Sequence, residues 1–254
     1  MGDVMIAKTE SGRLYERVAE DLAGKIASGH YAVGGRLPSE RDLAQAYAVS
    51  RPTVREAIIA LELDGLVEVR LGSGVYVTAR APRGGEAGKM DVGPFELLEA
   101  RRAIEGESAA LAAALITDAQ LEELQGLVAE MQAENPRDVV MSEDADRRFH
   151  LLIATATENS AIVAAVQMLW DARARSPQTK LLSAKAHAAG VTPSVDEHAE
   201  ILEALRQRSP DAARRAMRDH LTRVLTSLLA ATEVHELEQA RARIAAERKR
   251  YGAG

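Results

Sequence analysis

The sequence lacks cysteine and has few aromatic residues. Phenylalanine, tryptophan and tyrosine make up 3% of its 254 residues, whereas 46% are hydrophobic, mostly alanine, leucine, valine and isoleucine. Without cysteine, disulfides, zinc ribbons and thiol catalysis are excluded, so histidine and carboxylate side chains must hold any metal ion. The abundance of small and branched apolar residues favours packed helices over a β-sandwich.

Long hydrophobic runs are also missing. The longest, residues 109–116, has about half the length that a membrane-spanning helix requires. The N-terminus lacks the basic start and apolar core of a secretory signal, and Ile6 stands where a myristoylation signal has serine or threonine. We therefore expect a cytoplasmic protein that has no membrane partner.

The formal net charge of −6 at pH 7 argues against a protein that binds nucleic acid over its whole surface. It does not exclude a small DNA-reading face, because the placement of charge matters more than its total. Four arginines gather between residues 36 and 55: Arg36, Arg41, Arg51 and Arg55.

Residues 1–78 show the pattern of a winged helix-turn-helix domain. Apolar residues at helical spacing predict a helix over 13–28, and Ser39 and Ser50 are expected to cap two further helices. From Val67 the apolar period changes to two, and Gly72-Ser73-Gly74 turns the chain into a second strand, which predicts a small hairpin. Leu43, Ala44, Val49, Val54 and Ile58 are expected to pack the second and third helices together.

The outward face of the third helix is predicted to present Ser50, Arg51, Thr53 and Arg55. Arginine can bridge the two acceptors of a guanine in the major groove, and serine and threonine reach phosphates or bases. Gly72 lies at the tip of the wing, where the chain can approach the minor groove or the backbone of DNA. The alternative is a winged helix used for protein contacts, with the arginines as a solvated surface.

Residues 34–77 resemble the DNA-binding half of the GntR family of bacterial regulators. The resemblance rests on the run LPSERDLA, SRPTVREAI and GLVEVR followed by glycine. It implies that a dimer recognises double-stranded operator DNA. It also implies DNA contacts for Arg41, Arg51 and Arg55, assisted by Ser50 and Thr53, with Gly72 at the wing.

The remainder of the chain is predicted to be a linker over 79–94, a helical domain over 95–232 and a charged helical tail over 233–254. The linker is rich in glycine, proline and charge and has no periodicity, whereas asparagine, proline and glycine separate a series of helical segments after it. The fold class that we expect is mainly α, with the winged helix-turn-helix followed by an all-α antiparallel bundle.

Three histidines of the helical domain are expected to meet. Asp146 and His150 share a helix face because they lie four residues apart, whereas Asp144 points elsewhere. His198 and His220 lie at equal distances before and after Ser209, so each stands roughly 16 Å from the turn and the two lie side by side in an antiparallel pair.

Each of these histidines lies on an apolar stripe, and a single such residue is more often a core histidine with one hydrogen-bond partner. Burying several unpaired imidazoles is costly, and a metal ion removes that cost. The spacing therefore predicts a divalent-metal site formed by Asp146, His150, His198 and His220. Zinc is the expected ion, with nickel and manganese as alternatives.

The same residues resemble the FCD domain, the helical ligand-binding half found in the FadR-like branch of the GntR family. The matching stretches are FELLEARRAIEGESAALAA, DRRFHLLIATATEN, DEHAEILEAL and AMRDHL. The resemblance implies that an ion at these four positions helps to hold a carboxylate effector. It assigns Arg101 to that carboxylate, with a surface role as the alternative, and Asn159 to the closing of the pocket.

A narrower resemblance links residues 66–77, 91–105 and 169–177 to repressors of hexuronate utilisation, which act in glucuronate and galacturonate catabolism. Trp170, Arg173 and Pro177 match that group, and Arg173 is either an effector contact or a surface residue.

The sequence thus predicts a homodimeric regulator, a repressor and not an enzyme, whose operator binding responds to a sugar acid beside a metal ion. The rivals are a sensor of lactate, pyruvate or an aldonate, a metal-free sensor of an acyl-CoA-like or apolar molecule, and a helical metalloenzyme fused to a winged helix. Against the metalloenzyme, no extra glutamate or histidine on the same stripes suits general-base catalysis.

Overall fold

The computed structural model describes residues 14–70, 73–82, 92–134, 139–188 and 195–250. It divides into two compact units. The first contains the N-terminal part through Phe95, together with Pro177–Lys185 and the residues from Leu229 onward. The second contains Glu96–Ser176 and Ala186–Leu228.

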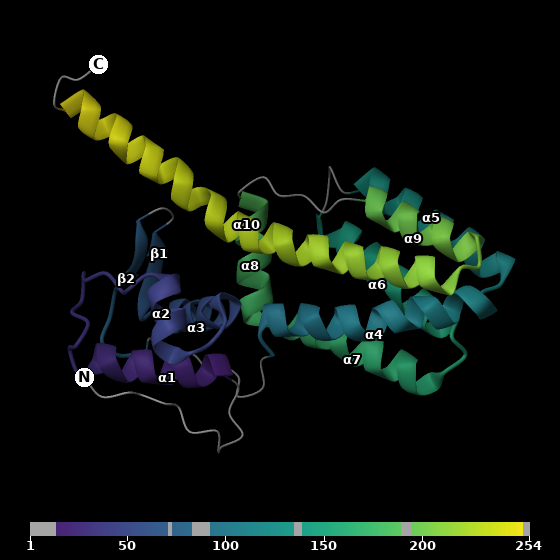
Figure 1. The fold of residues 1–254 in the computed structure, drawn as a ribbon, viewed down its shortest axis with the longest axis horizontal. Helices are drawn as coiled ribbons and strands as arrows, with labels where there is room; N and C mark the ends of the chain where they lie inside the picture. The colour runs from purple at the N-terminus through teal and green to yellow at the C-terminus, as the bar shows by residue number, and fades with distance from the viewer. Residues whose placement is uncertain (1–13, 71–72, 83–91, 135–138, 189–194, 251–254) are drawn as a thin grey trace. The chain divides into compact units, whose positions relative to one another are not determined.

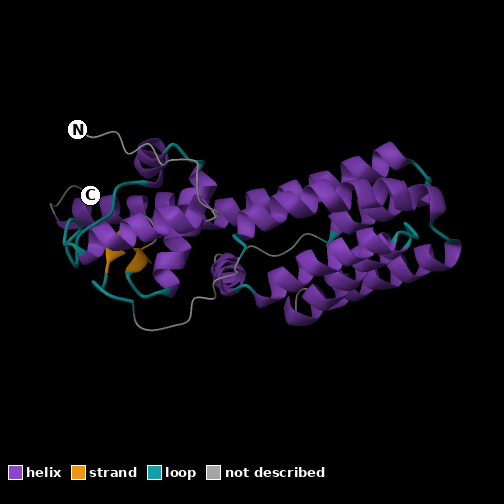
Figure 2. Cartoon of the chain, turned by 90° about the horizontal axis from the view of Figure 1, so that it is seen from below, coloured by secondary structure: helices purple, strands orange, loops and turns teal. Residues whose placement is uncertain are grey.

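The first unit contains three helices followed by a two-stranded hairpin (Figure 1). The elements are α1 (Leu14–Ala27), α2 (Glu40–Tyr47), α3 (Arg51–Leu63), β1 (Val67–Arg70) and β2 (Gly74–Val77). The strands are antiparallel, with Val67 opposite Val77 and Arg70 opposite Gly74. Figure 2 shows these two strands among helices, which confirms the predicted winged helix-turn-helix.

Local side-chain chemistry sets where α2 and α3 begin. The hydroxyl oxygen of Ser39 accepts a hydrogen bond from the Asp42 backbone N–H at 3.2 Å, and that of Ser50 accepts one from the Thr53 N–H at 3.2 Å. Each serine therefore satisfies a donor that the first turn of a helix leaves without a partner. Pro52 lies in the first turn of α3, where its missing N–H costs nothing.

The core of this unit consists of apolar residues from all three helices and both strands. Val18, Leu22 and Ile26 of α1 are fully buried against α2 and α3. Of the residues predicted to pack α2 on α3, Leu43, Val54 and Ile58 are buried, and Ala44 and Val49 pack against the same cluster. The pattern read from residues 40–58 is thus confirmed.

Ala48 ends α2 in the left-handed conformation, with φ at +53°. A non-glycine residue is disfavoured there because its Cβ approaches the following carbonyl, at a cost of about 1 kcal/mol. We expect Ala48→Gly to raise the free energy of unfolding of this unit by up to about 1 kcal/mol in a urea titration. Ala46→Gly, at an exposed position inside the same helix, should lower it by about 1 kcal/mol. A destabilised Ala48→Gly protein would contradict the conformation described for this turn.

The second unit is all-helical. Its helices are α4 (Pro94–Leu115, from Glu96 onward), α5 (Asp118–Glu134), α6 (Val139–Thr155), α7 (Ser160–Arg175), α9 (Asp196–Arg206) and the first half of α10 (Pro210–Arg250). Figure 1 shows α9 and α10 as a hairpin, joined by the tight turn predicted at Ser209-Pro210. The mainly α fold class is confirmed, and no helix in the described ranges is long and apolar enough to cross a membrane.

Two features of the helices differ from the sequence pattern. The periodicity does not predict α8 (Pro177–Ala188), which begins at a proline and whose residues through Lys185 pack with the first unit. Lys185 of this helix donates to Glu62 of α3 at 2.5 Å. In addition, α10 runs from Pro210 to Arg250 without the break expected after residue 232.

The core of the second unit is a cluster in which α4, α5, α6, α9 and α10 meet. Phe149, Ile153, Leu124, Ile201 and Met217 are essentially inaccessible to solvent. A smaller cluster surrounds Trp170 of α7 and includes Val166 and Ala154. The candidate site lies beside these two clusters, because His150 follows Phe149 in sequence and its ring lies 5.3 Å from that of Trp170, centroid to centroid.

Candidate metal centre and DNA-reading face

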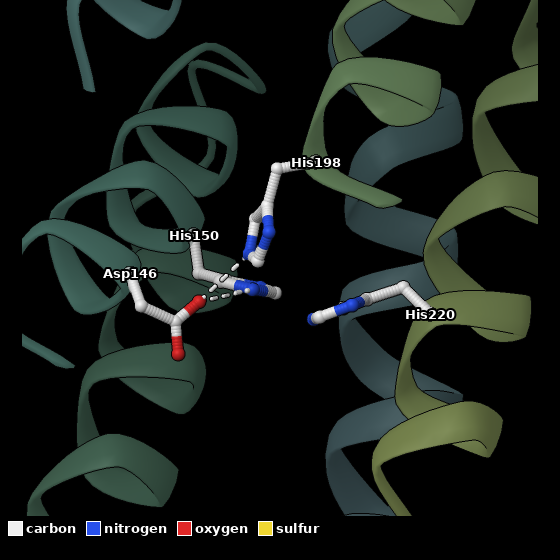
Figure 3. A group of neighbouring side chains, drawn as sticks. All are labelled: Asp146, His150, His198 and His220. Atoms are coloured by element: carbon white, nitrogen blue, oxygen red, sulfur yellow. Dashed lines mark hydrogen bonds and ion pairs between the residues drawn. The ribbon is translucent and has the colours of Figure 1, made fainter. Parts of the chain in front are cut away.

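Four side chains from three helices converge inside the second unit. Asp146 and His150 extend from α6, His198 from α9 and His220 from α10, and they point toward one another (Figure 3). Each offers one ligand atom, and these atoms all lie within 4.8 Å of one another. All three histidines are at most 4% exposed.

The convergence follows from helix geometry. Asp146 and His150 are one turn apart on α6, and the α9–α10 hairpin brings the rings of His198 and His220 to 4.5 Å between centroids. The predicted equal heights on the hairpin are therefore confirmed. Asp144 points away, because its side chain is 63% exposed and pairs with Arg148 at 3.8 Å.

Asp146 connects two of the histidines. Its Oδ1 atom lies 2.9 Å from Nε2 of His198 and 3.3 Å from Nε2 of His150. Burial opposes ionisation of Asp146, but the hydrogen bonds and charges of these two imidazoles hold the pKa of its carboxyl well below the ordinary value. The site thus contains an ionised carboxylate, which favours a cation.

The imidazoles differ in their protonation. Burial lowers the pKa of His220 to about 4, so its ring is neutral near pH 7 and carries a lone pair. Burial also acts on His150, but the charges of Glu105 and Asp146 outweigh it and raise its pKa. Because an imidazole binds a metal ion only in its neutral form, ion binding is expected to displace a proton from His150.

The residues fit a divalent metal ion. Both ring nitrogens of His150 are buried and neither makes a hydrogen bond of good geometry, although Glu105 lies close to Nδ1 and Asp146 close to Nε2. Three imidazole nitrogens and one carboxylate oxygen form a donor set that suits zinc and, with added ligands, nickel. The same arrangement would be costly without an ion, because buried polar atoms are normally hydrogen-bonded.

Two glutamates at this site were not predicted from the sequence. An oxygen of Glu105 on α4 contacts Nδ1 of His150, and Oε2 of Glu197 lies 2.8 Å from Nδ1 of His220. They do not bear on the expectation that the histidine stripes lack a glutamate suited to general-base catalysis, because both glutamates lie against a histidine ring. Glu105 lies one turn after Arg101, a spacing that would have indicated an ion pair, whereas nothing in the sequence places Glu197 against His220.

Arg101 is buried beside the four converging residues. It is 3% exposed, which excludes the surface alternative, and its Nε donates to Glu105 at 2.6 Å. Its guanidinium carbon lies 4.0 Å from the centre of the Trp170 ring, and that of Arg173 lies 5.3 Å from the same ring. Arg173 also donates to Glu143 at 3.0 Å, so the indole and two arginines form one polar and aromatic group.

Asn159 occupies a different kind of position. It is exposed and caps α7, where its side-chain oxygen accepts hydrogen bonds from the backbone N–H groups of Ala161 and Ile162 at 3.0 and 3.3 Å. These contacts describe a helix cap, and a pocket-closing role for Asn159 stays a prediction.

In the first unit, the start of α3 presents polar groups to the surface. Arg51 is half exposed, with a weak ion pair to Glu40 at 3.6 Å, and the Arg41 side chain on α2 is 87% exposed. The hydroxyls of Ser50 and Thr53 lie 2.8 Å apart at the N-terminus of α3. These four residues form a surface of the kind that reads DNA, because a helix N-terminus and arginines both attract phosphate.

Arg55 does not share this surface, so the expectation that it faces outward is wrong. It is 4% exposed, and its guanidinium makes two hydrogen bonds to the Glu40 carboxylate, with the Nε bond at 2.8 Å. The reason is that Glu40 of α2 and the backbone carbonyl of Leu229 both accept hydrogen bonds from its guanidinium and enclose it. A DNA contact by Arg55 stays a prediction, and Gly72 lies outside the described residues.

Two family models match this chain, one in each unit. The model of the bacterial regulatory proteins of the gntR family matches residues 14–77, and that of the FCD domain matches residues 96–223. The two matches cover the winged helix and the whole set Asp146, His150, His198 and His220. Glu105 and Glu197 also fall within the second match.

Curated relatives extend over nearly the whole chain. The Exu regulon transcriptional regulator of Escherichia coli K12 is 40% identical over 218 residues, which is 84% of this chain and 83% of that protein. The Uxu operon regulator of Haemophilus influenzae is 34% identical over 235 residues, 88% of this chain and 85% of that protein. Among solved structures, a GntR protein of Streptococcus agalactiae is 30% identical and covers 84% of this chain and 99% of its own, with a TM-score of 0.42. The chain thus belongs to the GntR family of DNA-binding transcriptional regulators and carries an FCD domain, and it is not an enzyme.

Proposed function

We propose that this regulator is a homodimeric repressor whose operator binding is released by a hexuronate that binds beside a divalent ion, most simply zinc. One observation carries the proposal: three buried histidines and an aspartate converge beside a buried arginine, in a chain that begins with a winged helix. The names of the Exu and Uxu relatives support the choice of a sugar acid.

Asp146, His150, His198 and His220 would hold the ion. When bound, the ion supplies a Lewis-acidic centre that attracts a carboxylate or hydroxyl oxygen. The surrounding core keeps bulk water out, since Phe149 packs edge-on against the His198 ring at 5.0 Å between centroids. The chain itself holds the four donors in place and excludes competing ligands.

Arg101 is the proposed partner of the effector carboxylate. A guanidinium has five N–H donors in a fixed fork, and Glu105 takes two of them, at 2.6 and 3.4 Å. The remaining donors suit a second carboxylate. Arg173, whose guanidinium also lies over the Trp170 ring, would contact the same ligand. Asn159, at the start of α7, would help to close the pocket.

The homodimer is supported by an exposed apolar pair on α4. Leu111 and Leu115 lie one turn apart and are 49% and 48% exposed. Neighbouring exposed leucines on one helix face indicate a surface that another chain covers. Sedimentation velocity of the full chain should show a dimer, and Leu111→Asp should shift it toward monomer.

Effector binding is expected to weaken the operator complex, which requires different effector affinities in the DNA-bound and free conformations. A thermal-shift screen with glucuronate, galacturonate, gluconate, lactate and pyruvate, each with and without chelator, tests the ligand. Stabilisation by hexuronates that chelator abolishes supports the proposal. If only lactate or pyruvate stabilises the protein, the effector is that acid and not a hexuronate. A gel-shift series in which no carboxylate changes operator binding would contradict effector control.

The proposed DNA contact of Arg51 predicts a loss of operator affinity. Arg51→Ala should weaken binding to an operator selected from random DNA by about 1–3 kcal/mol and relax its specificity, if the side chain reads a base. Fluorescence anisotropy at fixed salt measures the effect. Arg102→Ala, which removes an exposed arginine of α4 in the other unit, is the matched control. Equal affinity of the Arg51→Ala and Arg102→Ala proteins would contradict this contact.

A further inference from the structure

Two of the three converging histidines, His150 and His220, have a glutamate against the ring nitrogen Nδ1. His150 directs Nε2 toward Asp146, while its other nitrogen, Nδ1, contacts Glu105. His220 uses Nδ1 for Glu197 at 2.8 Å, and Figure 3 shows a ring nitrogen of His220 directed toward the other three side chains. Both glutamates are nearly inaccessible, at 2% and 9% exposure.

An arginine lies near each glutamate. Arg101 binds Glu105 at 2.6 Å, and Arg223 of α10 lies 3.6 Å from Oε1 of Glu197. An arginine, a glutamate and a histidine therefore lie next to one another in space at two places around the site. The two sets come from different helices. His198 differs, because among the described residues no ion pair joins its buried Nδ1 to a carboxylate, whereas Nδ1 of His150 contacts Glu105 and Nδ1 of His220 contacts Glu197.

A carboxylate at Nδ1 has a specific effect on an imidazole. A neutral ring has one N–H and one lone pair, and donation of Nδ1–H to a carboxylate places the lone pair on Nε2. The carboxylate also makes the ring more basic and fixes its rotation, which strengthens the bond of Nε2 to a metal ion. Both consequences serve a metal site and do nothing for an apolar core.

We propose that Glu105 and Glu197 are positioning residues that direct Nε2 of His150 and His220 to the metal ion without touching it themselves. This inference rests on the metal site of the proposed function. It also assigns unequal roles to the three histidines, since His198 binds the ion without such support.

The first test is metal affinity. Metal-free protein is titrated with Zn²⁺ in competition with a chromophoric chelator, and the Kd of the wild type is compared with those of Glu197→Gln and Glu197→Ala. We expect Glu197→Ala to weaken binding by about 10–100-fold. Glu197→Gln should show a smaller loss, because its amide oxygen still accepts the Nδ1–H. Glu203→Gln, at an exposed position on the same helix, should match the wild type.

Glu105 is tested by the glutamine variant, because alanine would leave Arg101 buried without its partner. Glu105→Gln should weaken Zn²⁺ binding measurably, by up to about tenfold, because its amide oxygen still accepts Nδ1–H but lacks the charge, whereas the exposed Glu99→Gln on the same helix should not. Circular dichroism of each variant establishes that it is folded. Should Glu105→Gln fail to fold, the Glu197 series still decides the proposal.

A second readout separates positioning from general packing. Proton NMR of the Co²⁺-loaded wild type should show hyperfine-shifted, exchangeable N–H signals of the ligated imidazoles. Glu197→Ala should lose the His220 signal to solvent exchange and keep that of His150. A wild type that takes up neither Zn²⁺ nor Co²⁺ would contradict the metal site itself. If the wild type binds Zn²⁺ and the Glu197→Ala protein binds it with equal affinity and gives unchanged N–H signals, the positioning role is overturned. The metal site itself would then stand.

Discussion

Chelation of the ion from the metal-loaded protein is expected to lower the melting temperature of the helical unit by about 8–10 °C. An ion present at a hundred times its Kd stabilises the folded state by about 2.7 kcal/mol. For a unit of this size each kcal/mol corresponds to roughly 3–4 °C. Differential scanning calorimetry of the loaded full chain, with and without chelator, measures the shift.

The variant His198→Ala should abolish this response. It removes one of four proposed ligands and leaves a cavity beside Phe149, so its melting temperature should lie at or below that of the chelated wild type and should not change with chelator. His30→Ala, at an exposed position of the first unit, should respond to chelator as the wild type does. An unchanged melting temperature of loaded wild type after chelation would contradict a metal site in this core.

Arg101→Met is expected to lower the free energy of unfolding by about 3–5 kcal/mol in metal-free protein. The change removes the arginine partner of Glu105 and leaves its buried carboxylate with the His150 ring as its remaining partner. Burial by itself would raise the pKa of Glu105, but the charges of Arg101 and His150 lower it to about 2. Because the folded-state pKa is depressed, this pairing stabilises the protein above the ordinary pKa of glutamate and is lost as the pH falls toward 2.

The double variant Arg101→Met with Glu105→Leu is the control for this prediction. Apolar residues of similar volume commonly replace a buried ion pair at little or no cost, so the double variant should recover most of the lost stability. Arg102→Met, on the exposed side of α4, should stay within about 0.5 kcal/mol of the wild type. Urea unfolding at neutral pH measures all three, and a double variant as unstable as Arg101→Met would show that the ion pair is not the cause.

The DNA-binding half was largely readable from the sequence because its signals are local. Ser39 and Ser50 cap helices through contacts within three residues, and the hairpin follows from a period of two around a glycine turn. The side of α3 on which Arg55 lies was not readable, because it depends on how α3 rotates against α2. Glu40 is fifteen residues away and holds Arg55 in the interface.

The four converging side chains were partly predictable from the sequence. Asp146 and His150 are one helical turn apart, and the single turn between α9 and α10 matches the heights of His198 and His220, so spacing along the chain was sufficient to find all four. No comparable rule connects Glu105 to His150 or Glu197 to His220. Those contacts join separate helices, and their distances follow from the packing of the bundle.

The sequence by itself determined the helical fold class, the winged helix and the choice of Asp146 over Asp144, because caps, periodicity and i,i+4 spacing act between residues close along the chain. Only the tertiary structure decided that Arg55 is buried, that α8 shares a unit with the winged helix, and that two glutamates contact the histidines. These features depend on helix rotation and on side chains brought together from distant segments, where packing and burial of charge outweigh local preference.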